Sequence, residues 1–85
     1  MDDKELARRA HELPGRFADR ISPETLEHVQ GAARGGEWDE EIDILLAGLQ
    51  KGDSAISAEE RDEIKALLDA MGEPSDRLDQ LTVID

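Results

Sequence analysis

Apolar residues recur at a helical period between residues 36 and 52, and this stretch holds the only tryptophan of the chain. The stripe occupies positions i, i+4, i+7, i+8 and i+11 and consists of Trp38, Ile42, Leu45, Leu46 and Leu49. Such spacing places the side chains on one face of an α-helix. We therefore predict a central amphipathic helix that ends near Gly52, where a glycine readily adopts the left-handed backbone conformation.

Acidic residues surround this stripe, and we expect them on the solvated faces of the helix. They are Glu37, Asp39, Glu40, Glu41 and Asp43. Carboxylates in the first turns interact favourably with the partial positive charge of a helix N-terminus. Ile44 lies off the stripe by about 120° at the helical rotation per residue. We expect it either to contact a second neighbouring element or to remain available to a partner.

The first third of the chain predicts two more helices. Asp2 or Asp3 can cap a helix that runs to about Leu13, where Pro14-Gly15 punctuates it. Phe17 and Ile21 are then expected in a short linker, with both side chains packed inward. Ser22-Pro23 predicts the start of a second helix, with Ser as N-cap and Pro at the first helical position. Its apolar stripe is Leu26, Val29 and Ala33, and residues 32–36 are expected to form the turn into the central helix.

The segment after Gly52 predicts a loop over 53–56 and then a capping box, Ser57 to Glu60. The following helix has its stripe at Ile64, Leu67, Leu68 and Met71 and stops at Gly72. Ser75 can cap a last short turn that supplies Leu78 and Leu81. The tail, residues 82–85, is β-prone but has no evident second strand, so we expect it to pack on helices or fray. The pattern predicts one all-α domain over 1–85, a compact bundle of four to five short helices.

Charge is distributed unevenly along the 85 residues, whose formal net charge is −12. Residues 1–35 carry seven acidic and six basic side chains, whereas residues 36–85 carry fifteen and four. Such an excess of acid disfavours binding to nucleic acid or to anionic membranes. The absence of cysteine excludes disulfides and thiolate chemistry, as is common in cytosolic proteins. No apolar leader or membrane span is evident, so the expected location is cytoplasmic.

The segment 49–60 has a partial likeness to the end of a calcium-binding EF-hand loop. Ile56 fits the eighth position of such a loop and Glu60 the twelfth. Leu49, Lys51 and Ser54 then occupy the first, third and sixth positions, where calcium loops need Asp, Asp or Asn, and Gly. We therefore expect Glu60 to cap a helix rather than to bind calcium.

Residue patterns for other metal sites and for catalysis are incomplete as well. Asp39, Glu40 and Asp43 place carboxylates at metal-compatible helical spacing, but neither His11 nor His28 belongs to a Glu-x-x-His motif. Acid–base catalysis needs paired groups in a partly desolvated pocket, which small helices with acidic outer faces do not suggest. We expect no metal, no cofactor and no enzymatic activity.

A longer pattern resembles a known family. It comprises G-E-W at 36–38, then Ile42, Leu45 and Leu49, I-S-A-E-E at 56–60, Ile64, Leu67-Leu68 and Ala70-Met71-Gly72. These residues look like those of small helical immunity proteins of bacterial polymorphic toxin systems, of the contact-dependent-inhibition and Maf type. The resemblance covers 36–72 and implies a cytoplasmic protein that binds and blocks one cognate toxin domain. Toxins of such systems are diverse, and many are nucleases with cationic surfaces.

Charge and resemblance together predict a partner with a basic surface. The expected contact residues are acidic side chains of the second half and the off-stripe isoleucine: Glu37, Asp39, Glu40, Asp43, Ile44, Glu59, Asp62 and Glu63. Exposed charges would then speed association, and apolar anchors would slow dissociation. Two alternatives remain open: a non-catalytic interaction or adaptor module, and an acidic mimic of nucleic acid.

Overall fold

The computed structural model describes residues 1–84 and forms one small helical domain. The elements, in chain order, are α1 (Asp3–Phe17), η1 (Ala18–Arg20), α2 (Pro23–Arg34), α3 (Trp38–Lys51), β1 (Ile56–Ser57), α4 (Ala58–Met71), α5 (Asp76–Asp79) and β2 (Val83–Ile84). The predicted bundle of four to five short helices is confirmed. Within the described residues, no helix combines the length and the apolar composition needed to cross a membrane.

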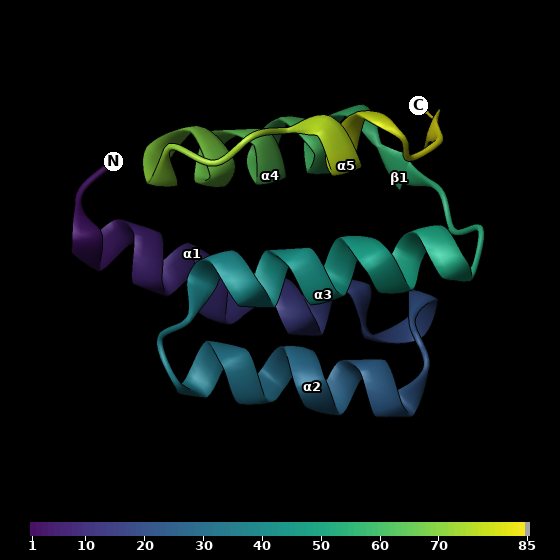
Figure 1. Cartoon of the computed structure of the whole chain (residues 1–85), viewed down its shortest axis with the longest axis horizontal. Helices are drawn as coiled ribbons and strands as arrows, with labels where there is room; N and C mark the ends of the chain where they lie inside the picture. Colours follow the sequence, from purple (N-terminus) through teal and green to yellow (C-terminus); the bar gives the residue numbers. More distant parts are fainter. Residues whose placement is uncertain (85) are drawn as a thin grey trace.

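Helix α3 lies in the middle of the bundle, with α2 on one side of it and α4 and α5 on the other (Figure 1). Helix α1 also packs against α2, α3 and α4, so α3 is covered from several directions. Ile42, Leu45, Leu46 and Leu49 of the predicted stripe are buried in the core. Trp38 is partly buried and packs against this core. The prediction of a central helix is therefore confirmed.

Helix α1 continues through Pro14, although the sequence suggested that it ends near Leu13. The apolar stripe explains the difference, because Leu6, Ala10, Leu13 and Phe17 are all buried along one face. Burying Phe17 by continuing the helix offsets the backbone hydrogen bond that proline cannot make. The predicted inward packing of Phe17 is correct, but the residue belongs to the helix and not to a linker. Ile21 follows η1 and packs on the core as expected.

Helix α2 begins as predicted, with the Ser22 hydroxyl accepting a hydrogen bond from the Thr25 backbone N–H. Its end differs from the prediction, because residues 32–34 are still helical and Ala32 and Ala33 are buried. The turn is shorter and uses Gly36, whose φ of 73° is accessible to glycine at little cost. At the end of α3, Gly52 has a φ of −83° and does not adopt the predicted left-handed conformation. Asp53 adopts it instead, with a φ of 53°.

Helices α2 and α3 approach each other closely at Gly48. A Cβ atom placed on this glycine would lie 2.6 Å from Cγ2 of Thr25 and 3.5 Å from Cγ2 of Ile21. A larger residue at this position would require the Thr25 side chain or α2 to move. The absence of a side chain at Gly48 therefore sets the spacing of the α2–α3 pair.

The C-terminal segment confirms the capping box and corrects the prediction for the tail. The Ser57 hydroxyl accepts from the Glu60 N–H, and the Glu60 carboxylate accepts from the Ser57 N–H. Helix α4 ends as predicted at Gly72 in the left-handed conformation. Strand β2 pairs in parallel with β1, with Ile56 opposite Val83, so the tail does have a second strand. Asp85 of the predicted tail lies outside the described residues.

Candidate functional site

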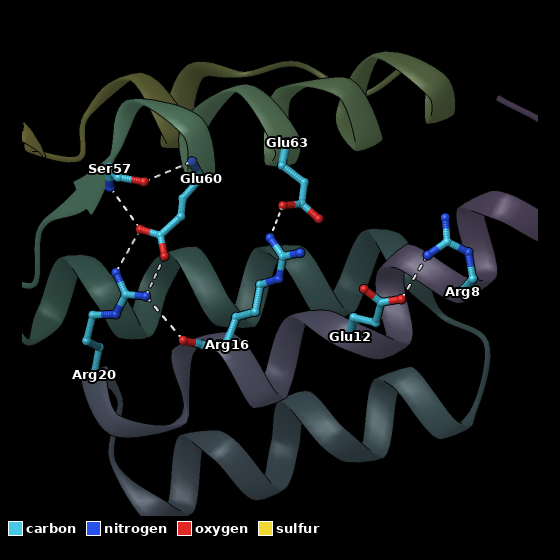
Figure 2. A network of polar contacts seen from close by, with 7 residues as sticks. All are labelled: Arg8, Glu12, Arg16, Arg20, Ser57, Glu60 and Glu63. Atoms are coloured by element: carbon cyan, nitrogen blue, oxygen red, sulfur yellow. Dashed lines mark hydrogen bonds and ion pairs between the residues drawn. The ribbon is translucent and has the colours of Figure 1, made fainter. Parts of the chain in front are cut away.

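Charged residues between α1, η1 and α4 form a closed network (Figure 2). Arg20 donates to both carboxylate oxygens of Glu60, at 2.8 and 2.6 Å, and its guanidinium lies 4.5 Å from the centre of the Phe17 ring. The same carboxylate accepts the Ser57 N–H at 2.8 Å. The hydrogen bonds from Arg20 are the main reason that the pKa of Glu60 falls to about 2. Glu60 is therefore fixed by internal contacts.

Most of the remaining charges of α4 also have partners within the domain. Glu63 accepts a hydrogen bond from Arg16 of α1 (Figure 2). Arg61 lies 3.6 Å from carboxylate oxygens of both Asp62 and Asp79, and Lys65 pairs with Asp69 one turn later. Of the predicted contact residues on this helix, only Glu59 has no ion pair within residues 1–84. Much of the charge on α4 is therefore neutralised internally.

The acidic residues of α3 are arranged differently. Glu37 precedes the helix, and Asp39, Glu40 and Asp43 are exposed on its surface. Within the described part of the chain, none of these four carboxylates lies within ion-pair distance of a basic side chain. Their negative charge is therefore not neutralised by a direct ion pair.

Glu41 departs from the sequence prediction, because its side chain is fully buried and not on a solvated face. It lies on the part of α3 that includes Trp38, three residues before it, and Leu45, four residues after it. Neither of its carboxylate oxygens has a hydrogen-bond partner within residues 1–84. Removal from water raises the pKa of Glu41 to about 8. At neutral pH the folded protein therefore holds this carboxyl group in its protonated, uncharged form.

A groove of about 540 Å³ runs between α2 and α3. Its lining combines acidic side chains, two basic residues and a small apolar surface: Glu27, His28, Gly31, Ala32, Arg34, Glu37, Glu40 and Ile44. Ile44 is partly buried there and also packs against the core, as one of the two expectations for it stated, and its use by a partner stays a prediction. The volume falls within the usual range of protein ligand pockets.

Two carboxylates on the α3 wall of this groove repel each other. A side-chain hydrogen bond with Glu37 and the negative charge of that residue raise the pKa of Glu40. Glu37 occupies the N-cap position of α3, but its side chain makes no capping hydrogen bond. Stabilisation of the helix N-terminus explains acidic residues in the first turn, but it does not require two carboxylates in contact.

The structure does not gather the eight predicted contact residues on one surface. Glu37, Glu40 and Ile44 line the α2–α3 groove, whereas Asp43 lines a separate hollow with α5 residues. Asp39 is exposed on α3, and Glu59, Asp62 and Glu63 belong to α4, on the other side of α3 (Figure 1). The α2 residues of the groove were missed by sequence reasoning. Their signal was the short Gly35-Gly36 turn, which makes α2 and α3 antiparallel neighbours and brings residues 27–34 beside residues 37–44.

The two histidines of the chain lie apart from each other. His11 packs edge-on against Trp38, with ring centres 5.3 Å apart, and His28 lines the groove. Within residues 1–84, no three His, Asp or Glu side chains are placed to hold a metal ion.

Comparison with protein-family models, with curated proteins and with solved structures gives no match for this chain. The resemblance to immunity proteins therefore stays a prediction.

Proposed function

We propose that this protein is a non-catalytic inhibitor that binds one partner protein with a basic surface, and that the partner is a cognate bacterial toxin domain. The proposal combines the residue resemblance over 36–72 with the charge arrangement of the folded domain. In this interpretation the protein acts in the cytoplasm and covers a cationic cleft of the toxin, so that substrate has no access.

The observation that carries the proposal is that the exposed acids at the start of α3 form no ion pair. The acids of α4 are largely paired within the domain, whereas Glu37, Asp39, Glu40 and Asp43 are exposed and form no ion pair within residues 1–84. Like charges held together in a folded domain reduce its stability, and a basic partner removes this cost on binding. An apolar side chain, Ile44, lines the groove together with Glu37 and Glu40 and supplies contact area.

The direct test is co-expression with the protein encoded by the neighbouring gene. We expect that gene to encode a secreted protein with a toxin domain, and we expect this chain to restore growth of cells that express the toxin. Purified toxin domain and inhibitor should form a one-to-one complex by calorimetry. A neighbouring toxin domain whose lethality is unchanged by co-expression would contradict the proposal, as would a neighbouring gene without any toxin domain.

A further inference from the structure

The buried carboxyl group of Glu41 lies on the side of α3 that α2 covers. Ile44, three residues later on α3, lines the groove together with residues of α2. Gly48, seven residues later, lies against Thr25 of α2. Residues at i, i+3 and i+7 share one face of a helix, so Glu41 belongs to the same face as these two contacts. Movement of α2 away from α3 would therefore bring this carboxyl group into water.

No charged group on the surrounding helices compensates Glu41. The titratable side chains of α2 are all exposed: Glu24, Glu27, His28 and Arg34. Those of α1 are exposed as well, His11 beside Trp38 included, apart from Glu5 and Arg9, which pair with each other. Helices α4 and α5 pack on the other side of α3 (Figure 1). Within residues 1–84, none of these groups forms a hydrogen bond with the Glu41 carboxyl group.

A carboxyl group in this position is neutral while the two helices are packed. The charged form of a buried carboxyl group without a partner is strongly disfavoured. Burial accordingly raises the pKa of Glu41 to about 8, against an ordinary value of 4.5. Contact with water returns the pKa to its ordinary value, so separation of α2 from α3 at neutral pH releases one proton. The packing of α2 on α3 is therefore weakened as pH rises.

Helix α2 is also held less firmly in the core than the other three long helices. Its buried residues are Val29, Ala32 and Ala33, so only one of them is larger than alanine. Helices α1, α3 and α4 each bury at least three leucine, isoleucine or phenylalanine side chains. Helix α2 lies at an outer edge of the bundle (Figure 1), and the turn that joins it to α3 contains Gly36 with a φ of 73°. Segments with few buried apolar contacts open at a lower free energy than the rest of a domain.

We propose that Glu41 is a proton-dependent latch for α2: its protonated carboxyl group allows α2 to pack on α3, and its ionisation accompanies the release of α2 while α1, α3 and α4 stay packed. The ion pairs Arg16–Glu63 and Arg20–Glu60 join α1 to α4 without any residue of α2. Glu60, whose pKa is about 2, stays charged at pH 6 and above. The latch operates in the free protein and does not depend on the identity of a partner.

The test is native-state hydrogen exchange of the ¹⁵N-labelled full chain, followed by NMR at pH 6 and pH 7. Where closing is faster than exchange, the ratio of the observed rate to that of an unprotected amide gives the opening equilibrium. We expect the helical amides of α2 to open about tenfold more at pH 7, because opening releases one proton. Amides of α4 should be better protected at both pH values. Low concentrations of urea should accelerate the α4 amides far more than the α2 amides, because they require complete unfolding.

Two matched variants assign the effect to the buried carboxyl group. Glu41→Gln removes the ionisable group and should abolish the tenfold change in α2. Glu27→Gln makes the same substitution on the exposed surface of α2 and should retain it. A tenfold change that persists in Glu41→Gln, or that disappears in Glu27→Gln, would overturn the proposal.

The wild type decides even if Glu41→Gln does not fold. Opening of α2 that is the same at pH 6 and pH 7 would contradict the latch. A single protection factor and a single urea dependence shared by the amides of α2 and α4 would contradict it as well, because the domain would then open only as a whole.

Discussion

The α1–α4 contact and the α2–α3 contact use charged residues in opposite ways. Between α1, η1 and α4, Arg16 and Arg20 meet Glu63 and Glu60, and the capping box of α4 is part of the same network. Between α2 and α3, the helices approach closely at Gly48 and acids line an open groove, and Glu41 of α3 is buried without a partner. Ion pairs stabilise the first contact, whereas the acids of α3 have no ion pair that offsets their mutual repulsion. A region that carries such a cost in the free protein is the better candidate for binding.

The largest expected effect concerns pH and the buried carboxyl group. The pKa of Glu41 is about 8 in the folded protein, against an ordinary value of 4.5. Between these values the folded state keeps a proton that the unfolded chain has lost, so the free energy of unfolding falls as pH rises, by up to about 1.4 kcal/mol per pH unit. The effect is absent below pH 4.5 and reaches its full size above pH 8.

Glu41→Gln should remove this dependence, because glutamine has nearly the same shape and does not ionise. Urea unfolding at pH 5, 6.5 and 8 measures the slope directly. We expect the variant to lie close to the wild type at pH 5 and to be more stable at pH 8. A wild type whose stability is constant or rises from pH 5 to pH 8, with the same profile in the variant, would contradict the burial of an unpartnered carboxyl group.

The ion pair of the α1–α4 contact should show the opposite pH dependence. The pKa of Glu60 is lowered to about 2, so its stabilising contribution is complete above pH 4.5 and is lost as pH falls toward 2. Arg20→Met keeps the aliphatic stem over Phe17 and removes the guanidinium. We expect a loss of about 2–3 kcal/mol at pH 6, since a partly buried carboxylate would lose its partner.

Arg8→Met is the matched control for this variant. Arg8 pairs with Glu12 at the exposed surface of α1 (Figure 2), and such pairs contribute about 0.3–0.5 kcal/mol. Thermal unfolding of both variants compares the two sites. Equal losses would mean that the Arg20–Glu60 network contributes no more than a surface ion pair.

Substitution of two glycines on α2 and α3 should have smaller effects on stability, and the two effects should have opposite signs. Gly48→Ala should destabilise the protein by about 1–3 kcal/mol, because its Cβ would lie 2.6 Å from Thr25 and force the helices apart. Gly31→Ala should stabilise it by about 0.5–1 kcal/mol, since alanine is the better helix former and the space is open. Melting temperatures that move in the same direction for both would show that the close approach at Gly48 does not set the helix spacing.

Local patterns in the sequence predicted much of the fold. The stripe of α3, the Ser22-Pro23 start of α2, and the Ser57–Glu60 capping box each depend on residues within one or two turns, and each is present. The errors came from contacts between distant segments. Burial of Phe17 carries α1 through Pro14, and pairing of β1 with β2 joins residues 27 positions apart.

The candidate site was only partly predictable for the same reason. Glu37, Glu40 and Ile44 were expected as contact residues, but the opposite wall of their groove comes from α2. Glu41 was expected in solvent because it is charged and lies outside the main stripe. The packing of several helices around α3 widens the buried face to include it. Internal pairing of Glu63 with Arg16 likewise depends on the α1–α4 contact, which no local pattern reveals.

The most direct measurement of the difference between the two regions is the association rate with the toxin domain, recorded by stopped flow over a range of salt concentrations. Glu37→Gln/Glu40→Gln and Glu59→Gln/Asp62→Asn each remove two negative charges, the first pair beside the groove and the second on α4. Because exposed charges act over about 8 Å at physiological ionic strength, location should matter more than net charge. We expect the groove variant to associate several-fold more slowly with a weaker salt dependence, and the α4 variant to remain close to the wild type. Equal slowing in both variants, or a larger effect on α4, would contradict the assignment of binding to the α2–α3 side.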